Sequence, residues 1–439
     1  MTPHRSAPTA VALAALLALA ACGESATLPL AAGTGPSPQL PEPSKTLFPT
    51  VHIAPAEAWT AGEKPTPAVG LAVSAYATGL DHPRWLHVLP NGDVLVAESN
   101  APKRPEEENG IRAFFMRQVM KRAGAGVPSA DRITLLRGLK ADGSAELRTV
   151  FAENLHSPFG MAHTDDAFYV ANTDGVVRFR YAPGMTRLES AGERVASLPA
   201  GPRNHHWTKS LIASPDGTKL YATVGSNSNA AENGLAAEEG RAAIWEIDPK
   251  AGTQRLFATG LRNPNGMAWA GGTLWTVANE RDEIGSDLVP DYMTSVRDGA
   301  FYGWPWSYYG QTVDARVQPP RPDMVAKAIA PDYALGAHTA SLGLAASAGN
   351  ALGAPFASGM FVGQHGSWNR KPRSGYKVVF VPFAGERPTG AQPVDVLAGF
   401  VDDAGNARGR PVGVAIDRSG ALLVADDVGN MIWRVTAAR

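Results

Sequence analysis

Short apolar segments alternate with turn residues along the chain from about residue 70 to its end. In the first such unit, residues 80–97, apolar residues flank the dipeptide Asn91-Gly92, which favours a two-residue hairpin turn. The same order of leading loop, apolar strand, turn and second apolar strand recurs further along the chain. The recurring units span residues 155–179, 206–248, 262–277, 359–381 and 410–435. This pattern predicts β-strands over most of the chain.

Six units with the same internal order are typical of a β-propeller. Each blade of such a fold buries its faces only against its two neighbours, so one pattern has to recur along the sequence. We therefore predict an all-β, six-bladed β-propeller over residues 70–439. The alternative of two packed β-domains agrees less well with the regular return of one motif.

A segment between the first two units, residues 101–131, departs from the strand pattern. Its apolar residues are spaced for one face of a helix, and basic residues surround them. We expect a short helical insertion after the first repeat, which either packs over one end of the propeller or lies on an acidic membrane surface. Packing is the more common role of such an apolar stripe. The apolar residues are Ile111, Phe114, Phe115 and Val119, and the basic ones are Arg112, Arg117, Lys121 and Arg122.

The N-terminus has the features of an export signal. Arg5 precedes an apolar run over residues 11–21, which is too short to cross a membrane as a helix. The run ends in Leu19-Ala20-Ala21-Cys22 and so resembles a bacterial lipoprotein signal, cut before Cys22 with that thiol then lipidated. An ordinary cleaved signal with an incidental cysteine is the alternative. We expect an exported, lipid-anchored protein on the periplasmic face of the cell envelope.

Three further features of the composition limit the possible organisation and function of the chain. Residues 22–69 are rich in Ala, Pro, Gly and Thr without lasting periodicity, which predicts a flexible tether between the signal, residues 1–21, and the propeller. Cys22 is the only cysteine, so no internal disulfide can form. The 40 basic and 41 acidic side chains nearly balance, and no dense basic cluster indicates nucleic-acid binding.

Polar groups lie at equivalent points of two neighbouring units. His205 and His206 precede the apolar strand of one unit, and Arg262 and Asn263 precede that of the next. Loops that lead into the strands of a rigid scaffold direct side chains toward a common axis. The combination suggests a site that takes up protons and holds an anionic cofactor.

Four phrases of the chain occupy residues 206–211, 260–266, 302–305 and 408–410. In this order they resemble phrases of the soluble glucose and sorbosone dehydrogenases. These bacterial quinoproteins use pyrroloquinoline quinone (PQQ) and calcium on a six-bladed propeller. The resemblance covers about residues 71–437, and the string 275–309 is especially similar to the sorbosone dehydrogenase branch.

The resemblance implies a role for each matching residue. It makes His206 the general base that takes the hydroxyl proton while hydride passes to the quinone, and imidazole has a suitable pKa for this task. It places Arg262 beside the quinone oxygens, where a fixed cation stabilises negative charge, and gives Asn263 a neighbouring cofactor contact. Arg408 and Arg410 match an arginine pair that meets the cofactor carboxylates. A solvated charged loop is the alternative for that pair.

The resemblance also implies where calcium binds. The catalytic ion would be held by the cofactor and by two backbone carbonyls, which fall at Glu280 and Arg281, and carbonyl oxygens are suitable ligands for this hard cation. There it would polarise the quinone carbonyl as a Lewis acid. Asp287 and Tyr302 are candidates for a second, structural calcium site.

The chain departs from the family pattern at three cofactor positions. His205 stands where the glucose enzymes can carry aspartate. The family's cofactor lysine has no clean match, although Arg370 or Lys371 could supply its charge. The glutamine of the second repeat falls near His156, which could replace its hydrogen bond.

We therefore predict PQQ- and calcium-dependent oxidation of an aldose or sorbosone-like sugar. The electrons would pass to a membrane quinone or a small cytochrome. A lactonase-type propeller hydrolase and a non-catalytic binding propeller are the alternatives. A hydrolase would need carboxylates and amides around an axial metal, whereas Arg262, Arg408 and Arg410 are basic. His206 favours catalysis over binding alone, although fold never proves function.

Overall fold

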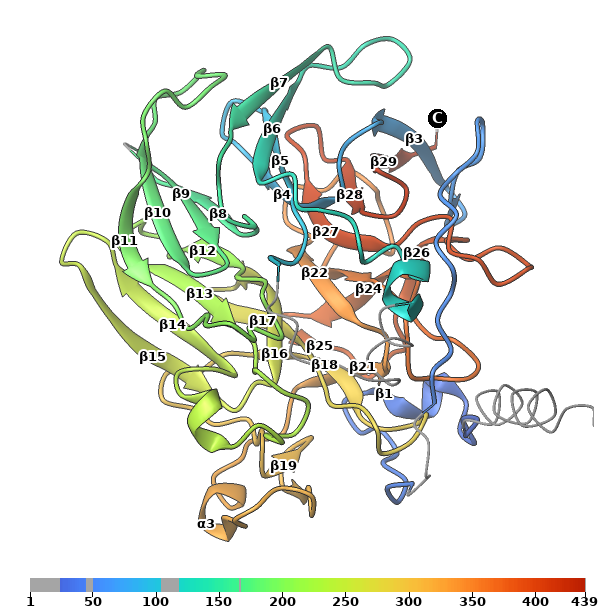
Figure 1. Cartoon of the computed structure of the whole chain (residues 1–439). Helices are drawn as coiled ribbons and strands as arrows, with labels where there is room; N and C mark the ends of the chain where they lie inside the picture. The colour runs from blue at the N-terminus through green and yellow to red at the C-terminus, as the bar shows by residue number, and fades with distance from the viewer. Residues whose placement is uncertain (1–23, 45–49, 104–117, 166, 439) are drawn as a thin grey trace, which may run out of the picture.

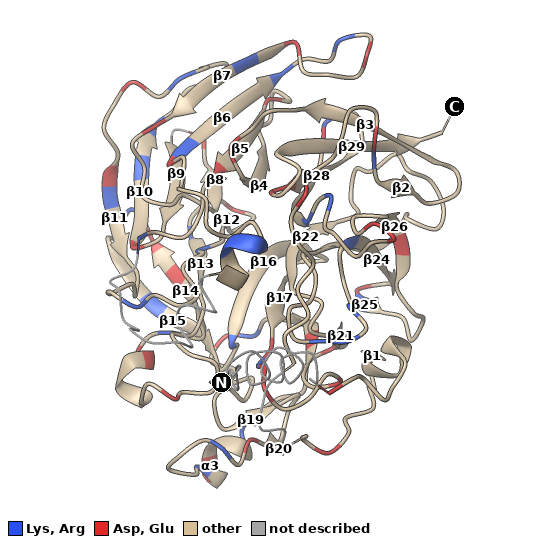
Figure 2. Cartoon of the chain, turned by 45° about the vertical axis from the view of Figure 1, so that its right-hand side comes forward, with Lys and Arg blue, Asp and Glu red and all other residues tan. Residues whose placement is uncertain are grey.

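Six antiparallel sheets are arranged around a central axis in the computed structural model, which describes residues 24–44, 50–103, 118–165 and 167–438. The predicted all-β, six-bladed propeller is thereby confirmed. In each blade one strand lies next to the axis and the last strand lies at the rim (Figure 1; Figure 2). The innermost strands are β4 (Pro83–Val88), β8 (Met161–His163), β12 (Leu211–Ala213), β16 (Asn263–Ala270), β22 (Ser341–Ala346) and β27 (Pro411–Ile416).

The remaining strands of the first three blades follow directly in the sequence. In the first blade these are β5 (Val94–Glu98), β6 (Arg132–Arg137) and β7 (Leu147–Ala152), and in the second β9 (Ala167–Asn172), β10 (Gly175–Arg180) and β11 (Glu193–Ser197). The third blade continues with β13 (Leu220–Val224), β14 (Ala243–Asp248) and β15 (Thr253–Thr259).

In the last three blades, unlike the first three, the fourth strand does not follow directly after the third in the strand order. The fourth continues with β17 (Thr273–Asn279), β18 (Pro290–Ser295) and β21 (Tyr333–Ala337), and the fifth with β23 (Gly359–Gln364), β24 (Lys377–Ala384) and β26 (Val394–Ala398). The sixth contains β28 (Leu422–Asp426), β29 (Met431–Ala437) and, as its outermost strand, β3 (Leu71–Ala77). The pairing of β3 with β29 closes the ring, because it joins the two ends of the propeller sequence in one sheet.

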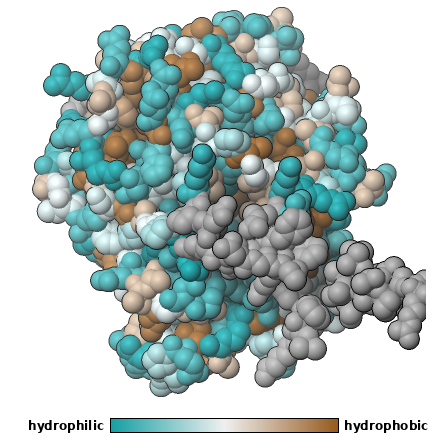
Figure 3. All heavy atoms as spheres, viewed as in Figure 1, coloured by the Kyte–Doolittle hydropathy of each residue, from teal (hydrophilic) through white to brown (hydrophobic). Residues whose placement is uncertain are grey.

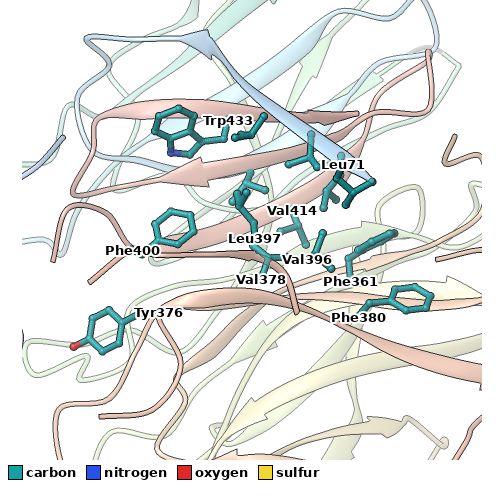
Figure 4. Packing of buried hydrophobic residues seen from close by; sticks show 14 of the residues in the cluster. Leu71, Phe361, Tyr376, Val378, Phe380, Val396, Leu397, Phe400, Val414 and Trp433 are labelled. Atoms are coloured by element: carbon teal, nitrogen blue, oxygen red, sulfur yellow. The ribbon is translucent and has the colours of Figure 1, made fainter. Parts of the chain in front are cut away.

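Apolar side chains fill the space between neighbouring blades. Between the fifth and sixth blades, Leu71, Val396, Val414 and Trp433 belong to one buried cluster (Figure 4). Full burial of an aliphatic side chain contributes about 1.5–3 kcal/mol, so such clusters supply much of the stability. Hydrophobic residues on the outer surface in Figure 3 form small groups among hydrophilic ones.

The N-terminal segment, in its described parts 24–44 and 50–69, is not a flexible tether. After the short helix η1 (Leu30–Gly33), β1 (Thr34–Gly35) pairs with β21 of the fourth blade, and β2 (Thr66–Pro67) pairs with β26 of the fifth. The prediction from composition is corrected because the main-chain groups of this segment find partners on the propeller. Residues 1–23, with the predicted signal and Cys22, lie outside the described residues.

The predicted insertion lies within the first blade, between β5 and β6, and not after a completed repeat. Its described part is helical over residues 118–122 and lies against the N-terminal segment, where the main-chain carbonyl of Arg122 accepts a hydrogen bond from the N–H of Ala56 at 2.9 Å. Ile111, Phe114 and Phe115 lie outside the described residues. Smaller additions are η2 (Leu235–Glu238), β19 (Ser307–Tyr308), β20 (Thr312–Val313), α3 (Pro322–Val325) and β25 (Arg387–Pro388).

None of the helices within the described residues is both long and apolar enough to span a membrane.

Candidate active site

The predicted site residues of the propeller, apart from Tyr302, belong to one of its ends, which we call the site face. At this end the innermost strands begin and the second strands of the blades finish, because the two are antiparallel. His206 precedes β12, Arg262 precedes β16 and Arg410 precedes β27. The fold therefore brings loops from different blades to one face, as the repeat pattern predicts.

His206 is half-buried, and its ring is oriented by the main chain of the neighbouring hairpin. Its Nδ1 lies 2.7 Å from the carbonyl oxygen of Ser226 and 3.1 Å from the Ser226 hydroxyl. In the neutral ring, Nδ1–H donates to that carbonyl, which leaves Nε2 as the unprotonated nitrogen. This tautomer is the one that a general base requires.

Asn263 and His206 both lie close to the point where a side chain of Gly225 would begin. A Cβ atom added to Gly225 would stand 2.5 Å from the Cβ of His206 and still closer to Oδ1 of Asn263. Nδ2 of Asn263 donates to Oδ1 of Asn279 at 3.3 Å, whereas its buried Oδ1 has no hydrogen-bond partner among the described residues. Two of the predicted site residues thus meet in the space that a side chain at position 225 would occupy.

Arg262 is buried and links the loops of the third and fourth blades. Its Nη1 donates to the carbonyl of Glu280 at 2.6 Å, and its Nε donates to the carbonyl of Asn229 at 3.1 Å. Its Nη2 lies 3.1 Å from Oδ1 of Asn229 and 3.5 Å from Oδ2 of Asp282. These contacts fix a buried cation. The backbone of Arg262 is joined to the loop of His206, because the N–H of Ser226 donates to the Arg262 carbonyl at 2.7 Å.

Of the two backbone carbonyls predicted to bind calcium, that of Glu280 does not fit the role in this arrangement. The Glu280 carbonyl already accepts the hydrogen bond from the Arg262 guanidinium, so calcium on the same oxygen would face a cation at close range. The Arg281 side chain is fully buried and paired with Glu280 and Asp314, both at 3.1 Å. No group of three or more His, Cys, Asp or Glu side chains among the described residues could hold a metal ion.

The two residues of the predicted second calcium site, Asp287 and Tyr302, have protein partners in the structure. Oδ2 of Asp287 accepts hydrogen bonds from the N–H groups of Thr27 and Leu28, at 2.6 and 3.0 Å, and its Oδ1 accepts one from Arg370. Tyr302 is buried in the fourth blade, where its hydroxyl donates to the Ser295 carbonyl at 2.5 Å. Asp287 fastens the N-terminal segment, and Tyr302 belongs to the core.

Three predicted cofactor residues contact the N-terminal segment. Arg370 donates to the carbonyl of Leu28 at 3.2 Å and lies 3.2 Å from Asp287. Lys371 is exposed, and its main-chain carbonyl accepts a hydrogen bond from Ala26. Arg408 lies 3.1 Å from Asp402 and 3.6 Å from Glu57. We expected the positive charges of Arg370 and Arg408 to face the cofactor, but neighbouring carboxylates balance both of them.

The two remaining predicted residues, His205 and His156, are exposed at the site face. His205 is exposed beside His206, with ring centroids 4.6 Å apart, and its N–H donates to Oδ1 of Asn227. His156 is also exposed, with Nδ1 3.5 Å from Oδ1 of Asp174.

A buried cluster around Asp427 was not predicted from the sequence. Its Oδ2 accepts hydrogen bonds from Arg84 Nη1 at 2.5 Å and from His365 Nε2 at 2.8 Å, and His82 Nε2 lies 3.6 Å away. Burial would raise the pKa of Asp427, but His365, His82 and Arg84 outweigh burial and hold that pKa well below its usual range. Burial lowers the pKa of His82 to about 4, so this imidazole is neutral near pH 7.

Arg84 and Arg410 carry unsatisfied donors next to aromatic rings. Arg84 lies 5.9 Å from the ring centroids of both Phe159 and Trp207, and Arg410 lies 5.3 Å from that of Tyr376. The buried Nε of Arg84 and the buried Nε and Nη1 of Arg410 have no hydrogen-bond partner among the described residues. Guanidinium donors beside aromatic faces suit a planar anion such as PQQ, a tricarboxylate.

The contact with Trp207, the residue after His206, connects Arg84 with the loop of the predicted base. The signal that could have revealed Arg84 is its place in the sequence. It is the second residue of the first innermost strand, β4, whereas Arg262 and Arg410 stand immediately before the innermost strands of their repeats.

Comparison with known proteins agrees with this architecture. The sequence model of the TrAA12-like family matches residues 65–290 and 322–438. The chain belongs to this family. Another protein, an uncharacterized one of Borreliella burgdorferi, is 24% identical to this TrAA12-like chain over 295 residues, covering 65% of the chain and 76% of that protein.

Two solved structures have the same fold as this TrAA12-like protein. The holo PQQ domain of pyranose dehydrogenase from Coprinopsis cinerea is 21% identical, with a TM-score of 0.66, and the match covers 88% of this chain and 100% of that domain. A calcium structure of a family AA12 carbohydrate-active enzyme from Trichoderma reesei is 17% identical, with a TM-score of 0.68, covering 89% and 99%. The resemblance predicted from sequence is thus confirmed at the level of the fold, and the sorbosone branch stays a prediction.

Proposed function

We propose that this TrAA12-like protein is a PQQ-dependent dehydrogenase that oxidises an aldose or a sorbosone-like sugar. One observation carries the proposal: an imidazole oriented as a base, His206, shares a face with Arg84 and Arg410. Nε of Arg84 and both Nε and Nη1 of Arg410 have no hydrogen-bond partner among the described residues, while Nη1 of Arg84 pairs with Asp427 and Nη2 of Arg410 with Ala54. The pyranose dehydrogenase named above has the same fold and contains a PQQ domain, which supports the proposal.

Arg84 and Arg410 would hold the carboxylates of PQQ, since guanidinium groups bind carboxylates through paired donors. Asn263 contributes amide contacts from the fourth blade. When bound, the quinone supplies the acceptor for a hydride from the sugar carbon. The chain's residues have to bind the cofactor, exclude water and remove the hydroxyl proton.

His206 removes that proton at Nε2, because its Nδ1–H donates to the Ser226 carbonyl. The backbone of Arg262 is joined to the loop of this base through Ser226, and its guanidinium supplies a fixed positive charge at the same face, 3.5 Å from Asp282. Its guanidinium is held by the carbonyls of Asn229 and Glu280, so it needs no rearrangement when negative charge develops nearby. The proposal includes no calcium step, because the predicted carbonyl ligand at Glu280 accepts from Arg262.

The same proposal extends to the location of the protein. The sequence that ends in Cys22 supports export and lipid anchoring at the periplasmic face of the envelope. A membrane quinone or a small cytochrome would then receive the electrons.

Reconstitution of the purified protein with PQQ tests the function. With PQQ added, the protein should reduce an artificial dye in the presence of aldoses or sorbosone, and no reduction should occur without PQQ or without sugar. Parallel assays with calcium and with a chelator decide whether the ion is needed. Failure to bind PQQ, or inactivity across a broad panel of sugars, would contradict the proposal.

A further inference from the structure

Residues 50–59 of the N-terminal segment, which we call the strap, lie on the site face along the fifth and sixth blades. On the fifth blade the strap contacts the loop after β23. The N–H of His52 donates to the carbonyl of Trp368 at 2.7 Å, and Nη2 of Arg373 donates to the carbonyl of Ile53 at 2.9 Å. The strap is therefore attached to the loop that also contains His365 and Arg370.

On the sixth blade the strap reaches Arg410. The carbonyl of Ala54, a fully buried residue, accepts a hydrogen bond from Nη2 of Arg410 at 2.9 Å. One residue further along, the carbonyl of Pro55 accepts the N–H of Ala407 at 2.6 Å, and Glu57 N–H donates to the carbonyl of Ala407 at 2.9 Å. The strap thus fixes both the guanidinium of Arg410 and the backbone just before it.

Trp59 completes the attachment through Asp426. Its indole Nε1 donates to Oδ2 of Asp426 at 2.7 Å, and its ring packs edge-on against Phe400 and Trp433, with centroids 5.7 and 5.4 Å apart. Figure 4 shows Phe400 and Trp433 toward one end of the cluster between the two blades.

The other carboxylate oxygen of Asp426 binds the main chain of Arg410, the arginine that we expect to contact the cofactor. Oδ1 of Asp426 accepts the N–H of Arg410 at 2.8 Å. A single buried carboxylate therefore joins the end of the strap to the backbone of Arg410.

We propose that the strap is part of the anion site and that Trp59 is a positioning residue for Arg410, acting through Asp426. The inference rests on the proposed function, because it takes the anion to be PQQ. The family match begins at residue 65, so the strap lies outside the part of the chain that the family model covers. A fixed arginine loses less side-chain freedom when the cofactor binds, which strengthens binding without a new contact.

Replacement of Trp59 by phenylalanine tests the proposal, since the aromatic packing is largely retained while the N–H is lost. The dissociation constant for PQQ, followed by fluorescence quenching of the cofactor-free protein, should rise about ten-fold through poorer preorganisation. Turnover at saturating PQQ should change little, because Trp59 acts through binding.

The variant Thr27→Val is the matched control. It removes the hydrogen bond from Thr27 Oγ1 to Asp287 at 3.1 Å and so loosens the same N-terminal segment at the fourth blade. Its dissociation constant for PQQ should stay within about two-fold of the unaltered protein. Equal weakening in both variants, or unchanged affinity in Trp59→Phe, would overturn the positioning role and leave the proposed function standing.

A second measurement needs no variant. Hydrogen exchange at the main-chain N–H groups of His52 and Glu57 should slow when PQQ is added to the unaltered protein, because these bonds attach the strap to the loops of the site. Exchange that PQQ binding leaves unchanged would contradict the proposal. If the unaltered protein does not bind PQQ, the proposed function and this inference both fail.

Discussion

His206 and Asn263 meet over the Cα atom of Gly225, in the space that a side chain there would occupy. The glycine is required for space, because a methyl group would lie 2.5 Å from the Cβ of the predicted base. This close approach fixes the spacing between the base of the third blade and the amide of the fourth.

Gly225→Ala should therefore separate the two side chains and lower sugar-dependent turnover by at least about ten-fold, since misplaced catalytic groups are costly. Steady-state dye reduction by the reconstituted variant measures the effect. Gly390→Ala is a suitable control, because an added Cβ there meets no atom within 4 Å. Equal activity in the two variants would show that the spacing has no catalytic importance.

The strands and the number of blades follow from the sequence because their signals are local. Alternating apolar residues and dipeptides such as Asn91-Gly92 act over a few positions and recur in each repeat. Closure of the ring by β3 has no such signal, since it depends on pairing with β29 at the other end of the chain. The composition of the N-terminal segment likewise gives no information about its partners on the propeller.

The site was predicted in part for the same reason. His206 and Arg262 stand in recognisable phrases at equivalent points of two repeats. Arg84, His365 and Asp427 come from three blades and form a cluster only in the folded protein, so no local pattern connects them. Arg370 and Arg408 were expected at the cofactor, but their carboxylate partners, Asp287, Asp402 and Glu57, could not be identified from spacing.

Replacement of Arg84 by methionine should weaken PQQ binding by about ten-fold or more, because it removes a guanidinium that we expect to contact a carboxylate. The pKa of Asp427 should rise, since Arg84 is one of the charges that hold it low. Titration of the cofactor-free variant with PQQ provides the measurement. Arg187→Met, which breaks an exposed ion pair with Glu153, should bind PQQ normally. Unchanged affinity in Arg84→Met would remove this residue from the site.

Asp426 should give the protein a measurable pH dependence of stability. Burial raises its pKa from the ordinary value of 3.8 to about 6. The folded protein then holds this proton more tightly than the unfolded chain, so the contribution of Asp426 to the free energy of unfolding falls as pH rises from about 4 through 6. The loss amounts to at most about 3 kcal/mol.

Asp426→Asn isolates this effect. The variant should be less stable by about 1–3 kcal/mol, because its amide loses an acceptor for the Trp59 and Trp433 indoles. The stability advantage of the unaltered protein should be largest near pH 4 and should shrink above pH 6. Denaturant unfolding at several pH values measures it, and an advantage that grew with pH would refute the raised pKa.

Replacement of Cys22 by serine should release the protein from membranes, if the thiol carries the lipid. Fractionation of cells that express each form provides the measurement, and the propeller itself should keep its activity after purification. A serine variant that still sediments with membranes would contradict the proposed anchor.

The central claim is that His206 is the base of a PQQ-dependent sugar oxidation, and reconstituted His206→Gln tests it most directly beside His205→Ala. The measurement is sugar-dependent dye reduction at saturating PQQ. The account predicts that His206→Gln binds PQQ but loses at least about a hundred-fold in turnover, whereas His205→Ala retains most of its activity. Undiminished turnover in His206→Gln would contradict the account.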